Sequence, residues 1–410
     1  MIAQTSTLSA RLDLPPSAPA AARAVFRVLA KLSIGRLHVH LPDGSSAHFG
    51  AHDSSGPQAA IRLVNWNVCG AALKSGDIGF AESYIAGDWQ SPDLPALLHL
   101  FIANREAIES VVYGSWWGSL LYRARHLLHR NSRRGSKKNI HAHYDLGNPF
   151  YRLWLDETMN YSSAWFGADR TQSLAEAQHA KVLRALDECG LQPGQRLLEI
   201  GCGWGAVAEA AATARGAQVV GVTLSAEQLA WAQSRIAAAR ATERVDLRLQ
   251  DYRDIDDEPF DAVVSIEMFE AVGREYWPSF FATLRSKLKP GGRACLQSIT
   301  IRDDLFERYV SGTDFIQQYI FPGGLLPSPS EFRKAARAAG LDVINELAFG
   351  ADYAETLRRW RERFLAEERR VRLIGFDTRF MRTWEFYLAY CEAAFAGGNT
   401  DVMQFTLRRI

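Results

Sequence analysis

Apolar runs and helical segments alternate between residues 192 and 350, and this order constrains the fold more than any other feature. Each short apolar run is typical of a buried strand and is followed by a segment with helical spacing. The expected strands lie at 196–200, 217–223, 245–249, 260–266, 293–299 and 341–348. A seventh strand is expected at 401–409, after an aromatic-rich helical insert at about 353–396 that is placed to cap a site. Such alternation predicts an α/β fold with a parallel sheet.

A glycine-rich turn follows the first expected strand. The sequence LEIGCGWG occupies residues 198–205, and its glycines let the backbone approach a ligand closely. A dinucleotide-binding turn favours GxGxxG with an acid roughly twenty residues later. Here the pattern is GxGxG preceded by Glu199, and Thr223 ends the second strand. The turn therefore favours S-adenosylmethionine (SAM) over a dinucleotide and predicts a Rossmann-like, SAM-dependent methyltransferase sheet, with a purely structural turn as the remaining alternative.

Polar residues after the second and third strands are the candidate contacts of this cofactor. The ribose diol needs a hydrogen-bonding partner at the end of the second strand, where Thr223 and Gln228 lie. Asp251 and Tyr252 follow the third strand and suit the edge and the face of adenine. Each of the four also has a simpler interpretation as an ordinary polar residue at the end of a strand.

Composition excludes several classes of protein. A chain of 410 residues, 47% hydrophobic and 23% charged, is expected to form more than one globular domain. A net charge of +1 provides no general field for nucleic acid. The five scattered cysteines form no CxxC pair and no Cys/His cluster, so neither a disulfide framework nor a metal site is expected. No apolar stretch approaches the roughly 20 residues that span a bilayer, and the N-terminal residues do not resemble a secretory signal.

Four segments are expected along the chain. They are a flexible tail (1–23), a smaller N-terminal α+β domain with an accessory, lipid-associated role (24–107), a basic linker (108–140) and the catalytic domain (141–410). Within the N-terminal domain, alternation predicts a strand over 36–41, Pro42-Asp43-Gly44 predicts a turn, and apolar spacing predicts a helix over 94–107.

The linker combines tryptophans with cations. Trp116 and Trp117 precede seven basic residues between 123 and 138, and no acid occurs from Ser110 to Tyr144. One interpretation is a segment that binds an anionic membrane surface, with tryptophans at the level of the headgroups. The other is a solvated helix and linker, which is the more common structure of a charged run.

Seven motifs in chain order resemble the signature of cyclopropane-fatty-acid synthases. They are HYDLGN (143–148), YSSAWF (161–166), LEIGCGWG (198–205), GVTLSAEQ (221–228), DYRD (251–254), EMFEAVG (267–273) and YIFPGGLLPS (319–328). The resemblance extends over about residues 82–410. It implies that the chain transfers a methylene unit from SAM to the cis double bond of an unsaturated acyl chain in a membrane phospholipid, forming a cyclopropane ring.

The resemblance also implies roles for individual residues. Tyr161 and Ser162 would lie over the head group and methionine part of SAM, while Gly201 and Gly203 would contact it through the backbone. His143 and Asp145 are more consistent with organising their loop than with chemistry.

An alkene has no proton to lose before it attacks the sulfonium, so methyl transfer leaves a carbocation. A base must then remove a proton from the new methyl group, in a site from which water is excluded. The resemblance implies that this base is a bound bicarbonate held by Glu270 and Tyr319. A carboxylate there would orient the ion and raise its basicity through the like-charge effect on pKa. The residues alone favour Glu270 over Glu267 only narrowly.

Two positions depart from the family pattern. Ser163 stands where the family usually has cysteine, and Gln297 stands where many members have histidine. Gln297 can donate a hydrogen bond to an anion but cannot titrate near neutral pH. A methyltransferase that stops at a methylene- or methyl-branched chain is therefore an alternative, and a lipid carrier without catalysis is a third.

The resemblance further implies a homodimer, and unsaturated phospholipid acyl chains as the partners of the site. Together with the unpaired cysteines, it places the protein in the cytoplasm, at the inner face of the membrane.

Overall fold

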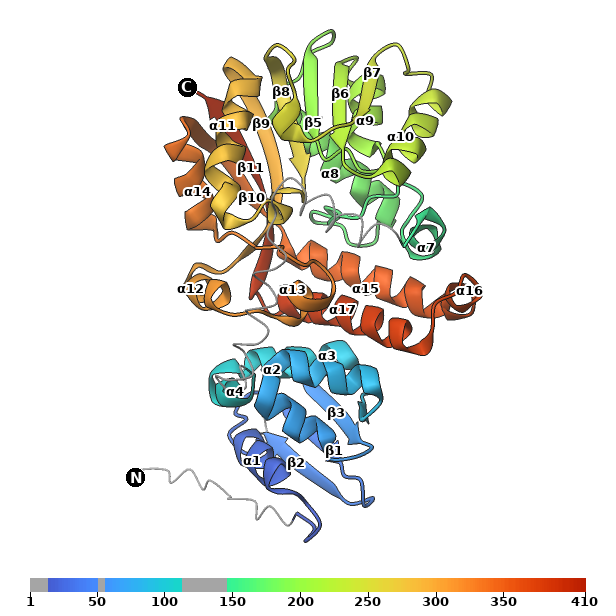
Figure 1. The fold of residues 1–410 in the computed structure, drawn as a ribbon, viewed down its shortest axis with the longest axis vertical. Helices are drawn as coiled ribbons and strands as arrows, with labels where there is room; N and C mark the ends of the chain where they lie inside the picture. Colours follow the sequence, from blue (N-terminus) through green and yellow to red (C-terminus); the bar gives the residue numbers. More distant parts are fainter. Residues whose placement is uncertain (1–13, 51–55, 113–145) are drawn as a thin grey trace. The chain divides into compact units, whose positions relative to one another are not determined.

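The computed structural model describes residues 14–50, 56–112 and 146–410 (Figure 1). The chain divides into two compact units. One comprises Met1–Tyr122 with Arg382–Phe386, and the other comprises Arg123–Met381 with Tyr387–Ile410. Across the described ranges, every helix is too short or too polar to cross a bilayer.

The first unit is built on a four-stranded sheet of order β2-β1-β3-β4. Its helices and strands are α1 (Ala20–Leu29), β1 (Arg36–His40), β2 (Ser46–Gly50), β3 (Gln58–Leu63), α2 (Asn67–Ala86), β4 (Trp89–Gln90), α3 (Leu94–Ala103) and α4 (Arg105–Val112). Strand β1 pairs antiparallel with β2 and parallel with β3. Leu37 and Val39 are buried while Arg36 and His40 are exposed, which is the alternation that predicted this strand.

The predicted helix over 94–107 is two helices, because Asn104 interrupts it. The buried Asn104 amide accepts hydrogen bonds from Ser33 N and Ile34 N and donates to Ile34 O and Leu100 O. A side chain that bonds backbone groups in this way competes with helix continuation. Helix α1 also begins at Ala20, inside the stretch expected to be a flexible tail.

The second unit is an α/β domain around a seven-stranded sheet of order β10-β11-β9-β8-β5-β6-β7 (Figure 1). Its strands are β5 (Arg196–Ile200), β6 (Gln218–Thr223), β7 (Val245–Leu249), β8 (Phe260–Ile266), β9 (Leu288–Ile301), β10 (Leu341–Ala348) and β11 (Thr400–Arg409). Strands β5 to β9 are parallel, and β11 runs antiparallel between β9 and β10. The α/β class and the seven predicted strands are confirmed.

The helices of the second unit either precede the strands of this sheet in the sequence or alternate with them. They are α7 (Asn148–Trp154), α8 (Leu174–Glu188), α9 (Ala206–Ala214), α10 (Ala226–Ala238), α11 (Trp277–Lys287), α12 (Asp303–Ser311), α13 (Phe315–Tyr319), α14 (Pro329–Ala338), α15 (Gly350–Ala366), α16 (Glu368–Leu373) and α17 (Thr378–Ala396), with short 3-10 turns η1 (Tyr252–Asp254), η2 (Phe269–Ala271) and η3 (Arg274–Tyr276). The last three helices are the predicted insert. Ser225 and Ser328 cap α10 and α14 with side-chain acceptors, which explains where those helices begin.

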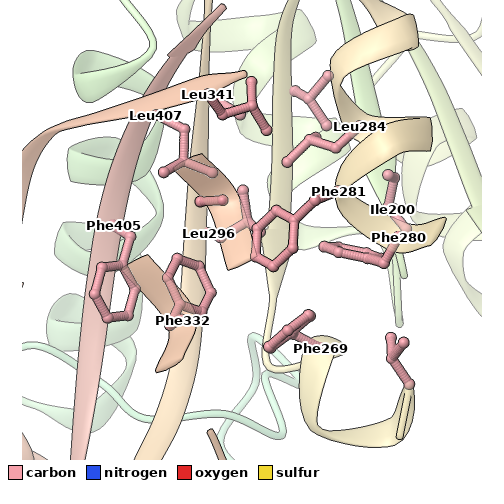
Figure 2. Close-up of a cluster of buried hydrophobic side chains, with 14 of the residues drawn as sticks. Ile200, Phe269, Phe280, Phe281, Leu284, Leu296, Phe332, Leu341, Phe405 and Leu407 are labelled. Carbon is pink, nitrogen blue, oxygen red and sulfur yellow. The ribbon is translucent and has the colours of Figure 1, made fainter. Parts of the chain in front are cut away.

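A phenylalanine-rich core fixes the segment that follows β8 (Figure 2). Phe269 is 1% exposed, and its ring lies 5.0–5.4 Å from the rings of Trp277, Phe280, Phe281 and Phe332. Burying such a side chain contributes roughly 1.5–3 kcal/mol. Because Phe269 is held in this core, Glu267 and Glu270 on either side of it occupy fixed positions.

Candidate active site

The glycine turn leaves β5 with the backbone conformation that only glycine adopts easily. Gly201, Gly203 and Gly205 have φ values of +84°, +49° and +86°. A Cβ on Gly201 would lie 3.0 Å from Cγ of Met268, whereas a Cβ on Gly203 would meet nothing within 4 Å. The backbone of Gly203 therefore borders open space, as close approach of a ligand requires.

A cavity of about 170 Å³ opens at this turn, where the carboxyl ends of β5, β6 and β8 meet. It brings together all eight residues predicted to contact SAM, which come from four separate segments of the chain. They are Tyr161, Ser162, Gly201, Gly203, Thr223, Gln228, Asp251 and Tyr252. The sequence motifs thus converge on one hollow, which is called the first cavity below.

The polar lining of the first cavity is partly held by internal hydrogen bonds. Thr223 Oγ1 donates to Gln228 Oε1 at 3.0 Å, which fixes both side chains at the end of β6. The Asp251 carboxylate accepts from Arg253 Nη2 at 2.6 Å and from Arg253 N at 3.0 Å. Asp251 therefore caps η1 in addition to lining the cavity, a role that the strand-end argument did not foresee.

Glu199, the acid before the glycine turn, provides the test of whether SAM fits. Its side chain is buried and lines the first cavity, and its Oε2 has no hydrogen-bond partner in the described parts of the chain. A buried acceptor without a partner is costly unless a ligand supplies the donor. The ammonium group of SAM is a cationic hydrogen-bond donor that could supply this partner, so the lining of the first cavity fits the cofactor.

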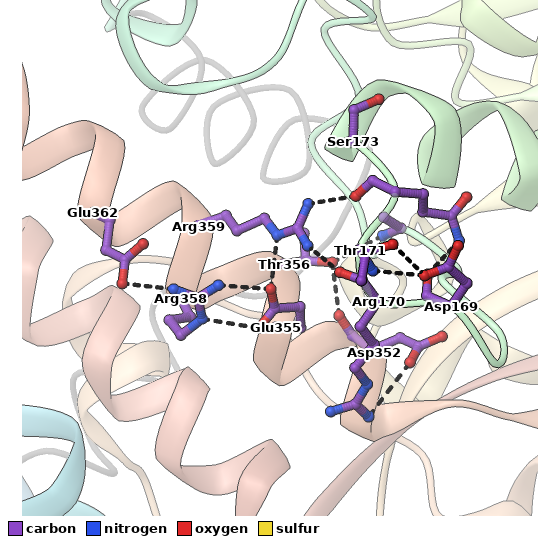
Figure 3. A network of polar contacts seen from close by, with 12 residues as sticks. Asp169, Arg170, Thr171, Ser173, Asp352, Glu355, Thr356, Arg358, Arg359 and Glu362 are labelled. Carbon is purple, nitrogen blue, oxygen red and sulfur yellow. Dashed lines mark hydrogen bonds and ion pairs between the residues drawn. The ribbon is translucent and has the colours of Figure 1, made fainter.

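The loop that carries Tyr161 and Ser162 is fastened to α15. Asp352 Oδ2 accepts hydrogen bonds from Phe166 N at 2.9 Å and Gly167 N at 3.1 Å. Arg359 donates to backbone oxygens of the same loop, and Glu355 holds Arg359 in place (Figure 3). Helix α15 therefore positions a loop that forms one wall of the first cavity.

A second cavity of about 210 Å³ adjoins the first, and both are lined by Tyr161, Glu267 and Ala271. Most of its wall is apolar or aromatic. The wall includes Ile316, Phe321, Leu325, Leu326, Tyr353, Leu357, Tyr387, Tyr390, Ala394 and Phe395. The helical insert supplies the last six of these, so the insert does form part of a site. A cavity lined mostly by apolar and aromatic side chains suits a hydrocarbon chain.

Glu270 lies in the second cavity with one oxygen satisfied and one not. Its Oε1 accepts hydrogen bonds from Ile299 N and, at 3.1 Å, from Ser298 Oγ. Its Oε2 is buried and has no partner among the residues that the structure describes. Burial, followed by repulsion from Glu267, raises the pKa of Glu270 to about 8.

Glu267 is surrounded by donors instead. Its Oε1 accepts from Ser163 N at 2.9 Å and Gln297 Nε2 at 2.7 Å, and its Oε2 accepts from Tyr353 OH at 2.7 Å. Gln297 Oε1 in turn accepts from Gln404 at 3.0 Å. The two departures from the family pattern, Ser163 and Gln297, therefore both bind Glu267, and neither lines the first or the second cavity.

Tyr319 is the last residue of α13, where its ring packs 5.4 Å from that of Phe315. It lines neither cavity, although its neighbours Gln317 and Phe321 line the second. The segment 319–328 does meet Glu270, since Leu325 N donates to Glu270 O at 2.8 Å. His143 and Asp145 lie outside the described residues. Within the described ranges, no group of three or more His, Cys, Asp or Glu residues could hold a metal ion.

Sequence reasoning missed Lys181, which is fully buried on α8. Its ammonium donates to Ser162 Oγ at 2.6 Å, and its nearby acids include Glu267 and Glu199. Burial lowers the pKa of Lys181 to about 8. A signal was present, because Lys181 shares a helical face with Ala177, Gln178 and Ala185, all of which are buried. A lysine on such a face indicates a buried acid nearby.

Residues 131–405 match the family model of mycolic acid cyclopropane synthetase. The chain is 40% identical to tuberculostearic acid methyltransferase UfaA1 of Mycobacterium tuberculosis, over 96% of this chain and 93% of the relative. It is 35% identical to cyclopropane-fatty-acyl-phospholipid synthase of Escherichia coli K12, over 86% of this chain and 88% of the relative.

Solved structures agree with these matches. The structure of mycolic acid cyclopropane synthase CmaA1 complexed with SAH and CTAB is similar with a TM-score of 0.63 and 34% identity, over 67% of this chain and 98% of that one. The cyclopropane synthase MmaA2 from Mycobacterium tuberculosis gives 0.62 and 33%, with the same coverage. Given the seven-stranded sheet, the glycine turn and these matches, the chain belongs to the cyclopropane synthase family of SAM-dependent methyltransferases.

Proposed function

We propose that this enzyme transfers a one-carbon unit from SAM to the cis double bond of unsaturated acyl chains in membrane phospholipids and closes a cyclopropane ring. The observation that carries the proposal is the meeting of two cavities. One is polar and built on the glycine turn, the other is largely apolar, and Tyr161, Glu267 and Ala271 line both. A donor in the first and an alkene in the second would face each other there.

Bound SAM supplies an electrophilic methyl group, whose carbon bonds to the alkene as its bond to sulfur breaks. The chain's own residues must then exclude water and stabilise the positive charge. Aromatic side chains that line the second cavity, such as Tyr353 and Phe395, exclude water and present ring faces to positive charge on the acyl chain. Tyr161 OH and Tyr387 OH hydrogen-bond at 2.7 Å, which joins the cofactor loop to α17 over the junction.

Loss of a proton from the new methyl group needs a base, for which we propose a bicarbonate. Glu270 fits as its holder, because Oε2 of Glu270 is buried in the second cavity without a partner in the described parts. Tyr319 lines neither cavity, so its proposed role in holding the ion is tested separately by a Tyr319→Phe variant. Ser163 and Gln297 contribute by fixing Glu267.

A methylene- or methyl-branched product is a second candidate. The relative whose match spans 96% of this chain is named a tuberculostearic acid methyltransferase. In addition, Gln297 is engaged with Glu267 and Gln404 and cannot take up a proton. Ring closure and a methylene-branched chain both require methyl transfer and loss of a proton, so the shared chemistry of the site supports either. A saturated methyl-branched chain would also need a reductant, which a partner reductase would supply.

We further propose that the protein works at the inner face of the membrane as a homodimer, with residues 123–138 on anionic headgroups. The charge pattern of that segment supports the contact. The segment lies outside the described residues, so this part of the proposal rests on sequence.

The decisive experiment is the structure of the lipid product. Cells that make the wild-type protein should contain phospholipid acyl chains heavier by one carbon unit, detected by mass spectrometry. Cyclopropane and methylene chains are isomers, and proton NMR separates them because ring methylene protons resonate upfield of alkene protons. Cells that make Glu270→Gln provide the control. Unmodified lipid with both proteins would refute the proposal, and alkene methylene signals would select the second candidate.

A further inference from the structure

Two carboxylates in one short segment, Glu267 and Glu270, face the second cavity from different surroundings. Three donors surround Glu267, two on Oε1 and one on Oε2. The backbone N–H of Ser163 and the amide of Gln297 can only donate to it. A proton on Oε1 would meet two donors and no acceptor, so this geometry matches the ionised form of Glu267.

Glu270 has the opposite arrangement. Its two donors from other residues, Ile299 N and Ser298 Oγ, both bind Oε1, and the backbone N–H of Glu270 itself also lowers the pKa of this carboxyl group. Oε2 has no donor in the described chain and is buried in the cavity wall. A carboxylate there would carry an unsatisfied buried charge, which is expensive. A carboxylic acid protonated on Oε2 would instead direct an O–H group toward the cavity.

We propose that Glu267 is a positioning residue that remains ionised and thereby keeps Glu270 neutral, so that Glu270 presents an O–H donor to the second cavity. The expectation from sequence was a carboxylate at Glu270 that raises the basicity of a bound anion. The geometry points to a donor that holds the anion without repulsion. A carboxylic acid kept neutral at pH 7 to donate a hydrogen bond is a known device of active sites.

The other charged and titratable groups around the pair leave this arrangement intact. Lys181 on α8 is the buried cation near Glu267 and favours its ionised form. Tyr309 on α12 and Asp314 before α13 line the same cavity, as do Tyr353 on α15 and Cys391 on α17. Burial raises the pKa of the Tyr309, Tyr353 and Cys391 side chains, so these remain neutral.

The pKa shifts of Glu267 and Glu270 agree with the geometry of their hydrogen bonds. Burial, then repulsion from Glu267, raises the pKa of Glu270 to about 8, and no cation is among the causes. Burial also raises the pKa of Glu267, but Lys181, Ser163, Tyr353 and Gln297 each oppose that rise. One proton shared by the pair therefore resides on Glu270, and the pair titrates as a unit.

Infrared spectroscopy of protein with isotope-labelled glutamate tests the proposal without any assay of activity. Burial raises the pKa of Glu199 as well as that of Glu270, so the band of Glu270 is read from the difference between wild-type protein and Glu270→Gln. At pH 7 this difference should show the carbonyl band of a buried carboxylic acid that titrates with a midpoint near pH 8. In Glu267→Gln the repulsion is removed, so the midpoint should fall by about one pH unit or more. An unchanged midpoint in Glu267→Gln would overturn the proposal.

Two further variants separate charge from shape. Glu267→Asp keeps the charge and should keep the midpoint closer to wild type than Glu267→Gln does. Asp314→Asn removes a different buried charge of the same cavity while preserving a helix cap, and it should leave the midpoint of Glu270 in place. If Asp314→Asn and Glu267→Gln shifted the midpoint of Glu270 equally, the shift would come from the total negative charge of the cavity. That result would contradict a specific coupling between Glu267 and Glu270.

The consequence for catalysis rests on the proposed function and is measured separately. If cells show methyl transfer, the alkaline limb of the pH–rate profile should follow the infrared midpoint, falling together with it in Glu267→Gln. Methyl transfer that is lost while the infrared titration behaves as described would refute only the proposed function. A shifted infrared midpoint with an unshifted alkaline limb would refute the role of neutral Glu270 in turnover.

Discussion

Glu267 has a backbone conformation that side-chain-bearing residues rarely adopt, with φ of +48°. A non-glycine residue there stores roughly 1–3 kcal/mol of strain, which persists only where surrounding contacts impose it. Here the contacts are the three hydrogen bonds to its carboxylate and the buried ring of Phe269 two residues later. The strain is therefore further evidence that Glu267 is placed for the site.

Replacing Glu270 by Gln should abolish most turnover and leave SAM binding intact. Gln keeps the shape, the contacts with Ile299 and Ser298 and a hydrogen-bond donor toward the cavity, but it cannot exchange a proton with a bound ion as a carboxylic acid can, so a loss of about 100-fold or more is expected. Calorimetric titration with SAM and a radiolabelled methyl-transfer assay would measure the two effects. Wild-type turnover in this variant would remove Glu270 from the mechanism.

Glu270 should also make the stability of the wild-type protein depend on pH. Its pKa is raised from 4.5 to about 8, so between these values the unfolded chain is ionised and the folded chain is not. The free energy of unfolding should therefore decrease as pH rises through this window, by up to about 1.4 kcal/mol per pH unit from this residue. Urea unfolding at pH 5 to 8 should show a shallower decrease for Glu270→Gln, and parallel curves would contradict the buried neutral acid.

At the scale of elements, the parallel strands were predictable because each is a short apolar run bounded by turns. The predicted strand 341–348 and the observed β10 have the same bounds. Helices α12 and α13 were not predicted, because both are short. Helix α12 is amphipathic but has only nine residues, and α13 is about one turn long. Strand β9 begins at Leu288 and includes Pro290, whereas the predicted strand begins at 293.

The sequence predicted those residues of the candidate site that lie within continuous sequence motifs. Six of the eight predicted cofactor residues line one cavity because they follow strands of a parallel sheet, whose carboxyl ends meet at one edge. Tyr161 and Ser162 reach the same cavity on the loop between α7 and α8. Lys181 and Tyr353 could not be placed in this way, because they reach Ser162 and Glu267 only through tertiary packing between segments far apart in the sequence.

The fastening of the cofactor loop to α15 gives an element-scale prediction. Asp352→Ala would leave the buried N–H of Phe166 and the partly buried N–H of Gly167 without this acceptor, destabilising the protein by about 2 kcal/mol. It should also weaken SAM binding, because Tyr161 and Ser162 belong to this loop. Thermal unfolding and calorimetry would measure both effects.

Glu362 on the same helix provides the matched control. Its side chain is 55% exposed and pairs with Arg358, so Glu362→Ala should change stability by less than about 1 kcal/mol. If the two variants lost stability equally, the contact between Asp352 and the loop would contribute no more than any other side chain of α15, which would contradict the prediction.

At the scale of the whole molecule, a run of seven basic residues without an acid lies at 123–138, directly after the boundary between the two compact units at Tyr122. Replacing Arg133, Arg134, Lys137 and Lys138 with Ala should weaken binding to anionic vesicles at low salt, at about 1 kcal/mol per cation near the surface. Co-sedimentation with vesicles of rising anionic lipid content would measure this, and neutral vesicles should bind both proteins equally weakly.

A control for net charge removes four exposed cations from elsewhere in the chain. These are Arg302, Lys334, Arg370 and Arg372. If position matters, this variant should retain more vesicle binding than the linker variant. Equal losses of vesicle binding in the two variants would show that overall charge causes the attraction, and would refute a specific role for residues 123–138.

The place of β11 in the sheet has a consequence for how the protein is made. This strand pairs with β9 on one side and β10 on the other, although both are synthesised before it. It also receives the start of α15, through Asp401 Oδ1 and Gly350 N at 2.7 Å. During synthesis β10 therefore cannot join the sheet until β11 has been made, and a premature stop codon before Thr400 would leave β10 with no neighbour to pair with.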